Sequence, residues 1–381
     1  MRRHAGFTLI EIIAVLGIAV TIMGIGVGVM MTLGQKDKLV VAEQLVADAV
    51  RQARHTARST GGPVIVTLDK GTRLLYGASR TPIRTETFDN PNTGATPLGG
   101  TSSLNGRTGN GLRLGVDVPA PVPLSAKEQL YRGGKSDGFY IALDVRPPPA
   151  NSVRDGDLAP LVLIADDTAH INNSQVVLYL KCVKRRIQGT PQPVDYLCWD
   201  LRGAIVDKDG NPTVISTIDA QAGGGSDVAD PIMGETWFEA GFLYDKKQLV
   251  LYRDSRTVAK TAAPADLRSD HQDHLHLGKL VTPGNISMGS DVTWTGAGTV
   301  VDNVRLYRLG TSVIGRLPPG IEIAQDYQIV AHPDGQVEVN LSGGSANPNI
   351  ILKGQFKGAE TAEINVTTTG MVTSKIVTGV P

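Results

Sequence analysis

Met1-Arg-Arg-His-Ala-Gly6-Phe7-Thr8-Leu9-Ile10-Glu11 opens the chain and runs into an apolar segment that ends at Leu33. Between Phe7 and Leu33 the only ionisable side chain is that of Glu11. About 20 apolar residues are enough for an α-helix to cross a bilayer. The stretch therefore predicts a transmembrane helix over residues 7–33.

The charges around this segment predict its orientation and a role for Glu11. Arg2 and Arg3 precede the apolar run, and positive residues stay on the cytoplasmic side. We therefore expect a single-pass inner-membrane protein with a cytoplasmic N-terminus and exported C-terminal domains.

A secretory signal peptide has a shorter apolar core that is followed by its small residue, whereas Gly6 precedes this apolar segment. A carboxylate inside a membrane helix is costly, so Glu11 indicates a specific partner.

The segment Gly6-Phe7-Thr8-Leu9-Ile10-Glu11 resembles the processing signal of type IV pilins and type II secretion pseudopilins. The resemblance implies a leader peptide over residues 1–6, cleavage by a prepilin peptidase between Gly6 and Phe7, and N-methylation of Phe7. It also implies that Glu11 pairs with the free amine of a neighbouring subunit during filament assembly. Such a pair relieves the desolvation cost of both buried charges.

Composition indicates a β-rich protein of two or three domains beyond the first helix. The 381 residues are 41% hydrophobic, which is ample for sizeable cores. The formal net charge is zero and the pI is about 7.1, so no basic face argues for nucleic acid as a partner. The 44 glycines and 22 prolines suit short strands joined by tight turns.

An amphipathic helix and a hairpin are expected over residues 34–80, followed by a linker over residues 81–123. Apolar residues recur every three or four positions after Lys36, which predicts that one helix face packs on a sheet. Gly61-Gly62-Pro63 ends the helix, because glycine supplies the cap and proline cannot continue it. The hairpin follows from Pro63 to Tyr76. The apolar positions of the helix are Leu39, Ala42, Val46, Ala49, Val50, Ala53 and Ala57.

The middle of the chain, residues 124–309, contains strands at regular spacing. Gly138 to Pro147 forms an early strand, Leu249 to Asp254 a later one, and Gly298 to Tyr307 a closing one. This order resembles the concanavalin A-like, laminin-G-like jelly roll. Asp302 matches the acidic residue of the closing strand, for which a structural role is expected.

Residues 310–381 read as a meander of strands with hairpin turns. Arg316-Leu-Pro-Pro-Gly-Ile321 and His332-Pro-Asp-Gly335 are similar to segments of the H-type minor pseudopilins and their FimT-like relatives. The predicted fold class is therefore α+β. A long N-terminal helix packs on an antiparallel pilin sheet, and an all-β jelly-roll sandwich is inserted into that sheet at an exposed loop.

Two cysteines, Cys182 and Cys198, lie equally far from Thr190. A hairpin that turns at Thr190 would place them opposite each other, which favours a disulfide in an exported protein. Two buried free thiols are the alternative, because sequence alone does not give the geometry.

Two polar clusters could bind a metal. His271, His274 and His276 form a His-x-x-His-x-His pattern that could bind zinc, but a solvated polar loop is the favoured interpretation. The segment from Asp207 to Asn211 could offer oxygen ligands to calcium, but Asp-Gly is a common hairpin turn and the turn is favoured. No cofactor is therefore expected.

The sequence contains no nucleophile elbow, Walker loop, dinucleotide fingerprint or His-Glu-x-x-His motif. We therefore expect a minor pilin-like structural subunit of a type II secretion pseudopilus or a type IV pilus, and not an enzyme. Its partners would be other subunits through the helix 7–60, the prepilin peptidase, the inner-membrane assembly platform, and a glycan or protein ligand of the jelly roll. A membrane-tethered lectin or adhesin is the first alternative, and a tethered glycan hydrolase is the second.

Overall fold

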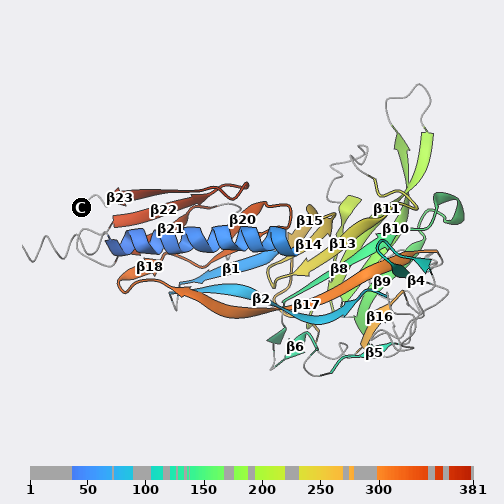
Figure 1. Ribbon diagram of the computed structural model, residues 1–381, viewed down its shortest axis with the longest axis horizontal. Coiled ribbons are helices and arrows are strands. Elements are labelled where there is room, and N and C mark those ends of the chain that lie inside the picture. The colour runs from blue at the N-terminus through green and yellow to red at the C-terminus, as the bar shows by residue number, and fades with distance from the viewer. Residues whose placement is uncertain are drawn as a thin grey trace, which may run out of the picture.

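The computed structural model of the protein describes residues 37–70, 73–88, 104–114, 121–125, 128–132, 135–136, 138–166, 176–187, 194–218, 231–268, 274–278, 298–341, 348–354 and 360–378. Most of this part of the chain is antiparallel strand, and one long α-helix covers residues 37–60. Figure 1 shows two regions along the long axis of the molecule: the helix with its neighbouring strands, and a β-sandwich.

Helix 37–60 has the amphipathic pattern that the sequence predicts. All seven apolar positions expected to face a sheet are buried, from Leu39 to Ala57. The helix ends where expected, because Gly61 has a φ of +62° and the Gly62 N–H donates to the Ala57 carbonyl at 3.2 Å. This bond from the second residue past the cap back into the last turn is that of a Schellman motif.

The helical region consists of helix 37–60 and the strands packed beside it. Its buried core contains apolar side chains from the helix, from two antiparallel sheets and from the segment that joins them. The strands are β1 (Val64–Asp69), β18 (Ile321–Ile323), β19 (Tyr327–Ala331), β20 (Val337–Leu341), β21 (Ile350–Gly354), β22 (Glu360–Val366) and β23 (Val372–Thr378). Strands β18, β21, β22 and β23 form a separate sheet in that spatial order.

The sandwich consists of two facing sheets. One contributes β8 (Gly138–Arg146), β13 (Phe238–Tyr244), β14 (Gln248–Arg253) and β15 (Arg256–Ala262). The other has the order β12-β11-β10-β9-β16-β5, with β5 (Val122–Pro123), β9 (Leu158–Ala165), β10 (Val176–Ile187), β11 (Val194–Val206), β12 (Pro212–Ser216) and β16 (His274–Leu277). Short pieces complete the region: β3 (Leu104–Asn105), β4 (Asn110–Arg113), β6 (Tyr131–Arg132), β7 (Lys135–Ser136) and a 3-10 turn, Ala150–Ser152.

Two long strands, β2 (Leu74–Glu86) and β17 (Val300–Arg316), run through both regions. They pair with each other, β2 also pairs with β1, and β17 also pairs with β8, so one sheet has the order β15-β14-β13-β8-β17-β2-β1-β19-β20. Strand β2 therefore extends into the segment 81–123 that was predicted to be a linker.

Strand β8 shows how the sandwich is covered on both sides. Its residues from Gly138 to Val145 are all buried. Phe139, Ile141, Leu143 and Val145 face the other sheet, as expected from the alternation of side chains along a strand. The alternate residues Tyr140 and Ala142 contact a second cluster that includes Ile65 and Val330 of the helical region. We call this second side the outer face.

The predicted α+β class with a pilin architecture is contradicted. The described chain is mostly β, built of several antiparallel sheets that include a large β-sandwich, and its long helix is a minor part. The physical reason is that strands pairing across the chain bury most of the apolar side chains, so helix 37–60 covers one region instead of organising the fold.

The predicted single-pass inner-membrane location is also corrected. Among the described residues, no helix is both long enough and apolar enough to cross a bilayer. The leader 1–6, the predicted transmembrane helix 7–33, and the residues Gly6, Phe7 and Glu11 lie outside the described residues. The domain boundaries given above, including 124–309 and 310–381, stay predictions.

Candidate binding site

A polar hollow of about 460 Å³ lies on the outer face of the sandwich. Strands β2, β8, β13 and β17 and the turn before β4 supply its lining. Its residues combine charged, amide and hydroxyl groups: Thr85, Thr87, Arg107, Asp144, Glu239, Asn303 and Arg305.

Strand register brings three carboxylates into one row, of which Asp144 and Glu239 line the hollow. Asp144 of β8 lies opposite Glu239 of β13 on one side and opposite Asp302 of β17 on the other. Residues that lie opposite each other in an antiparallel pair project to the same face. Because Leu143 and Val145 point into the core, the side chain of Asp144 points to the outer face.

Two arginines balance two of these carboxylates. Arg107 Nη1 donates to Asp144 Oδ1 at 2.7 Å, and Arg305 Nη2 donates to Glu239 Oε2 at 2.5 Å. The hydrogen bond to Asp144 raises the pKa of Arg107. Burial acts to lower the pKa of Arg305, but the adjacent Glu239 carboxylate outweighs it and the pKa is raised. Both guanidinium groups therefore stay charged.

A β-bulge positions the amide of Asn303. The register of β17 against β8 shifts between Asp302 and Arg305, and Asn303 has a φ of +49°. The extra residue re-aims the side chain, as bulges commonly do. Asn303 Nδ2 donates to Asp144 Oδ2 at 2.8 Å and to Thr108 Oγ1 at 3.0 Å.

Asp302 supports the site from below. It is fully buried, and its carboxylate accepts the Thr108 N–H at 3.0 Å and the Asn303 N–H at 2.7 Å. A Cβ added at Gly106 would lie 2.6 Å from Asp302 Oδ2, so the glycine allows the turn to approach this closely. These contacts agree with the structural role that the sequence predicts for Asp302.

An aromatic side chain, that of Trp237, stands two residues before Glu239 and contacts Arg146 of β8. Trp237 immediately precedes β13, and the guanidinium of Arg146 lies 5.5 Å from the centre of its ring. Arg146 is two residues from Asp144 in β8 and so projects to the same face. Trp237 is half-buried and stands two positions before the lining residue Glu239.

The predicted disulfide is not formed. Cys182 and Cys198 are buried free thiols, because the pairing of β10 with β11 sets Cys182 opposite Trp199 and Val183 opposite Cys198. A difference of one residue in register moves a side chain to the other face of a sheet. Burial raises the pKa of Cys182 to about 12 and that of Cys198 to about 11.

Neither of the two candidate metal clusters is assembled among the described residues. No group of three or more potential ligands is found in that part of the chain, and His271 lies outside it. His274 and His276 are in β16, and His276 Nε2 lies 2.6 Å from the Asp166 carbonyl. Asp207 forms the favoured turn instead of a calcium loop, because its Oδ1 accepts the N–H groups of Asp209 and Asn211.

The residues of the hollow were not singled out from the sequence. Asp144 stands in Leu143-Asp144-Val145 and Glu239 in Phe238-Glu239-Ala240, each a charge inside an otherwise apolar strand. Buried charges are rare unless they are paired, so this pattern was the available signal.

No protein-family model matches the sequence, and no curated protein matches it. Among solved structures, the chain is similar to domain 4 of the arabinanase AbnA of Geobacillus stearothermophilus, described in complex with arabinotriose. The identity is 14%, the TM-score is 0.30, and 67% of this chain and 93% of that one are covered. It is also similar to the binding domain of botulinum neurotoxin serotype G, at 11% identity, a TM-score of 0.34, and coverage of 77% and 74%.

A third similar structure is the sialidase module CBM40 of Ruminococcus gnavus, bound to α2,3-sialyllactose. Its identity is 12%, its TM-score is 0.28, and 54% of this chain and 91% of that one are covered. Likenesses this distant identify neither the family nor the ligand of this chain. Neither the described structure nor these comparisons support the partners predicted from the pilin resemblance, namely other subunits, the peptidase and the assembly platform.

Proposed function

We propose that the protein is a binding module whose outer-face hollow takes a neutral, hydroxyl-rich ligand, a glycan. The observation that carries this proposal is that donors and acceptors alternate around the hollow. Carboxylates of Asp144 and Glu239 accept hydrogen bonds, while Arg107, Arg305 and the Asn303 amide donate them. A sugar hydroxyl both donates and accepts, so it can bond to either kind of group.

The balance of charge supports a neutral ligand. Each of the two lining carboxylates is already matched by an arginine, at 2.7 Å and 2.5 Å. A charged ligand would compete with these ion pairs for the same charged groups. A neutral ligand leaves both ion pairs intact and exchanges only water.

The Trp237 ring supports the same ligand class. Aromatic side chains supply a large apolar surface at low entropic cost, and the C–H face of a sugar ring is apolar. Ligand sites commonly combine such a surface with a few fixed polar groups. The fixed polar groups of Asp144 and Asn303, together with Trp237 two positions before the lining residue Glu239, fit that description.

We propose binding without catalysis. Glycoside hydrolysis needs one carboxylic acid as a proton donor and a second carboxylate as base or nucleophile. Both lining carboxylates are already hydrogen-bonded to arginines, and Asn303 also donates to Asp144. This arrangement favours a fixed recognition surface over proton transfer.

The experiment is a titration of the full chain with neutral oligosaccharides chosen from an immobilised glycan panel. Arg107→Ala removes an exposed donor and should weaken binding at least about tenfold, because hydrogen bonds to charged groups contribute about 1.5–3 kcal/mol. Trp237→Ala should weaken binding by a similar factor.

Arg256→Ala is the matched control, because Arg256 is exposed on β15 outside the hollow. Thermal unfolding of each variant separates lost binding from lost folding. Equal affinity of Arg107→Ala, Trp237→Ala and the original chain would refute the proposed site. Release of reducing ends from any bound glycan would refute the absence of catalysis.

A further inference from the structure

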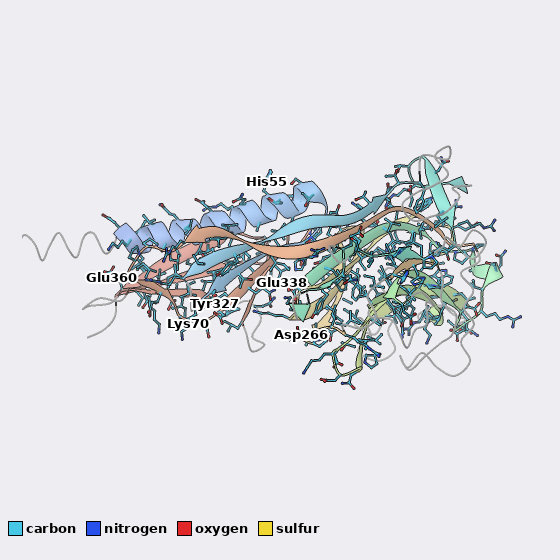
Figure 2. The ribbon with its side chains drawn as sticks, turned by 90° about the horizontal axis from the view of Figure 1, so that it is seen from below. His55, Lys70, Asp266, Tyr327, Glu338 and Glu360 are labelled. Atoms are coloured by element: carbon cyan, nitrogen blue, oxygen red, sulfur yellow. The ribbon has the colours of Figure 1, made fainter. Side chains whose placement is uncertain are left out.

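A second hollow, of about 420 Å³, lies at the C-terminal half of helix 37–60, in the other region of the molecule. Four of its lining residues are basic, namely Arg51, Arg54, His55 and Arg58, and Ser59 and Gly370 complete the lining. Side chains three and four residues apart lie on one face of a helix, so the four basic residues form a single stripe. Figure 2 shows His55 on the side of the helix that faces away from the sheets.

Two glycine turns hold the arginines of this stripe. Gly370 has a φ of +75°, and a Cβ added there would lie 2.6 Å from Arg54 Cδ. Gly335 has a φ of +89°, and its Cβ would lie 3.1 Å from Arg58 Cδ. Arg54 Nε also donates to the Gly335 carbonyl at 3.0 Å. The turns thus support the arginine stems and pre-organise the stripe.

The positive charge of the stripe is only partly balanced within the described chain. Arg51 pairs with Asp48 at 2.8 Å, but no carboxylate of the described residues pairs with Arg54 or Arg58. Like charges four residues apart destabilise a helix by about 0.2–0.5 kcal/mol per pair. The helix dipole favours cations only within the last turn, which accounts for Arg58 but not for Arg51 or Arg54.

We propose that this hollow binds a doubly charged oxyanion, a phosphate or sulfate group. The planar guanidinium presents N–H donors in a fork that matches the oxygens of such a group. Arg54 and Arg58, one helical turn apart and held by neighbouring turns, supply two such forks. The site does not depend on the glycan hollow, which is built from other residues.

The test is calorimetric titration of the full chain with inorganic phosphate, inorganic sulfate and acetate at low ionic strength. Phosphate and sulfate should bind with a Kd of about 1 mM or tighter, and acetate at least about tenfold more weakly, because one carboxylate matches fewer donors. Arg58→Gln, which changes an exposed residue, should weaken phosphate binding about tenfold. Arg54→Gln combined with Arg58→Gln should abolish it.

Arg113→Gln is the matched control, because Arg113 is exposed on β4 in the sandwich and should leave phosphate binding unchanged. Glucose 6-phosphate, whose ester group carries two negative charges above its second pKa of about 6, then distinguishes two sources of the anion. Equal affinity for the ester and the free ion supports a site for the anion alone, and tighter binding of an ester supports an anionic group on a larger molecule. Unsaturable binding of every anion, or unchanged phosphate affinity in the double variant, overturns the proposal.

Discussion

The sandwich and the helical region fill their cores with different side chains. The sandwich core contains six large aromatic residues: Phe88, Phe139, Trp199, Phe238, Phe242 and Tyr244. Among the described residues, the buried core of the helical region contains one such residue, Tyr327, among alanines and branched aliphatic residues. Facing sheets lie about 10 Å apart and need long side chains to fill the layer. A helix on a sheet approaches more closely where its contact face carries alanine, as at Ala42, Ala49, Ala53 and Ala57.

Because their cores differ in this way, the two regions should lose stability in response to opposite changes in side-chain volume. The sandwich should be most sensitive to loss of volume, because an aromatic ring that spans the layer leaves a large cavity when it is removed. The helical region should be more sensitive to added volume, because its helix has no space under the alanines. Three measurements test this comparison and the contact between the regions.

The largest effect is expected from Phe242→Ala. The ring of Phe242 packs edge-on against Phe139 at 5.6 Å and reaches Gly203 of the facing sheet, where an added Cβ would lie 2.6 Å from it. Truncating a fully buried phenylalanine costs about 3–5 kcal/mol. Urea unfolding followed by circular dichroism measures the loss, and Val313→Ala, which changes an exposed residue, is the control. A loss equal to that of the control contradicts the expected role of the ring.

A smaller effect is expected from Ala53→Leu in the helical region. Ala53 is 3% exposed and lies against the core of that region. Inserting methylenes into a packed core costs about 1–3 kcal/mol. Gln52→Leu makes the same side chain at the neighbouring exposed position and should change the free energy of unfolding little. Equal free energies of unfolding for the two variants would mean that the core of the helical region accommodates the larger side chain without loss of stability.

The junction between the regions gives the smallest effect, which depends on pH. Tyr252 of the sandwich has its hydroxyl 2.8 Å from His332 Nδ1, and Lys260 Nζ lies 2.9 Å from Glu338 Oε1. Figure 2 shows Glu338 between the two regions. Burial acts to raise the pKa of Glu338, but His332 and Lys260 outweigh it and lower the pKa to about 2.

The pKa of Glu338 is lower in the folded protein than in the unfolded chain, where it is about 4.3, so the ionised carboxylate stabilises the fold above that pH. This contribution is lost as the pH falls toward 2. Glu338→Gln should therefore cost about 1–2 kcal/mol near neutral pH, and the difference from the original chain should shrink between about pH 5 and pH 2. The free energy of unfolding measured across this range checks the expectation. Asp209→Asn, which changes an exposed carboxylate, should show no such convergence, and a pH-independent difference for Glu338→Gln would contradict the assigned ion pairs.

Much of the local structure follows from the sequence. The seven buried positions of helix 37–60, its end at Gly61, and strands such as β8 and β14 follow from the period of apolar residues and from glycine and proline. These signals are local, because each depends on a few consecutive residues. The inference from the N-terminal motif to a pilin architecture went further than such signals allow, and the mostly β organisation of the described chain contradicts it.

Tertiary structure alone decided which residues meet. The register of β10 against β11 separated Cys182 from Cys198 by one position, and no local pattern specifies a register to that precision. The two hollows join residues far apart in the chain, such as Arg107 with Asp144 and Arg54 with Gly370. Sequence period determines which face of a strand or helix is apolar, whereas a binding surface depends on pairing between distant segments. That pairing is set by the global packing of the two cores.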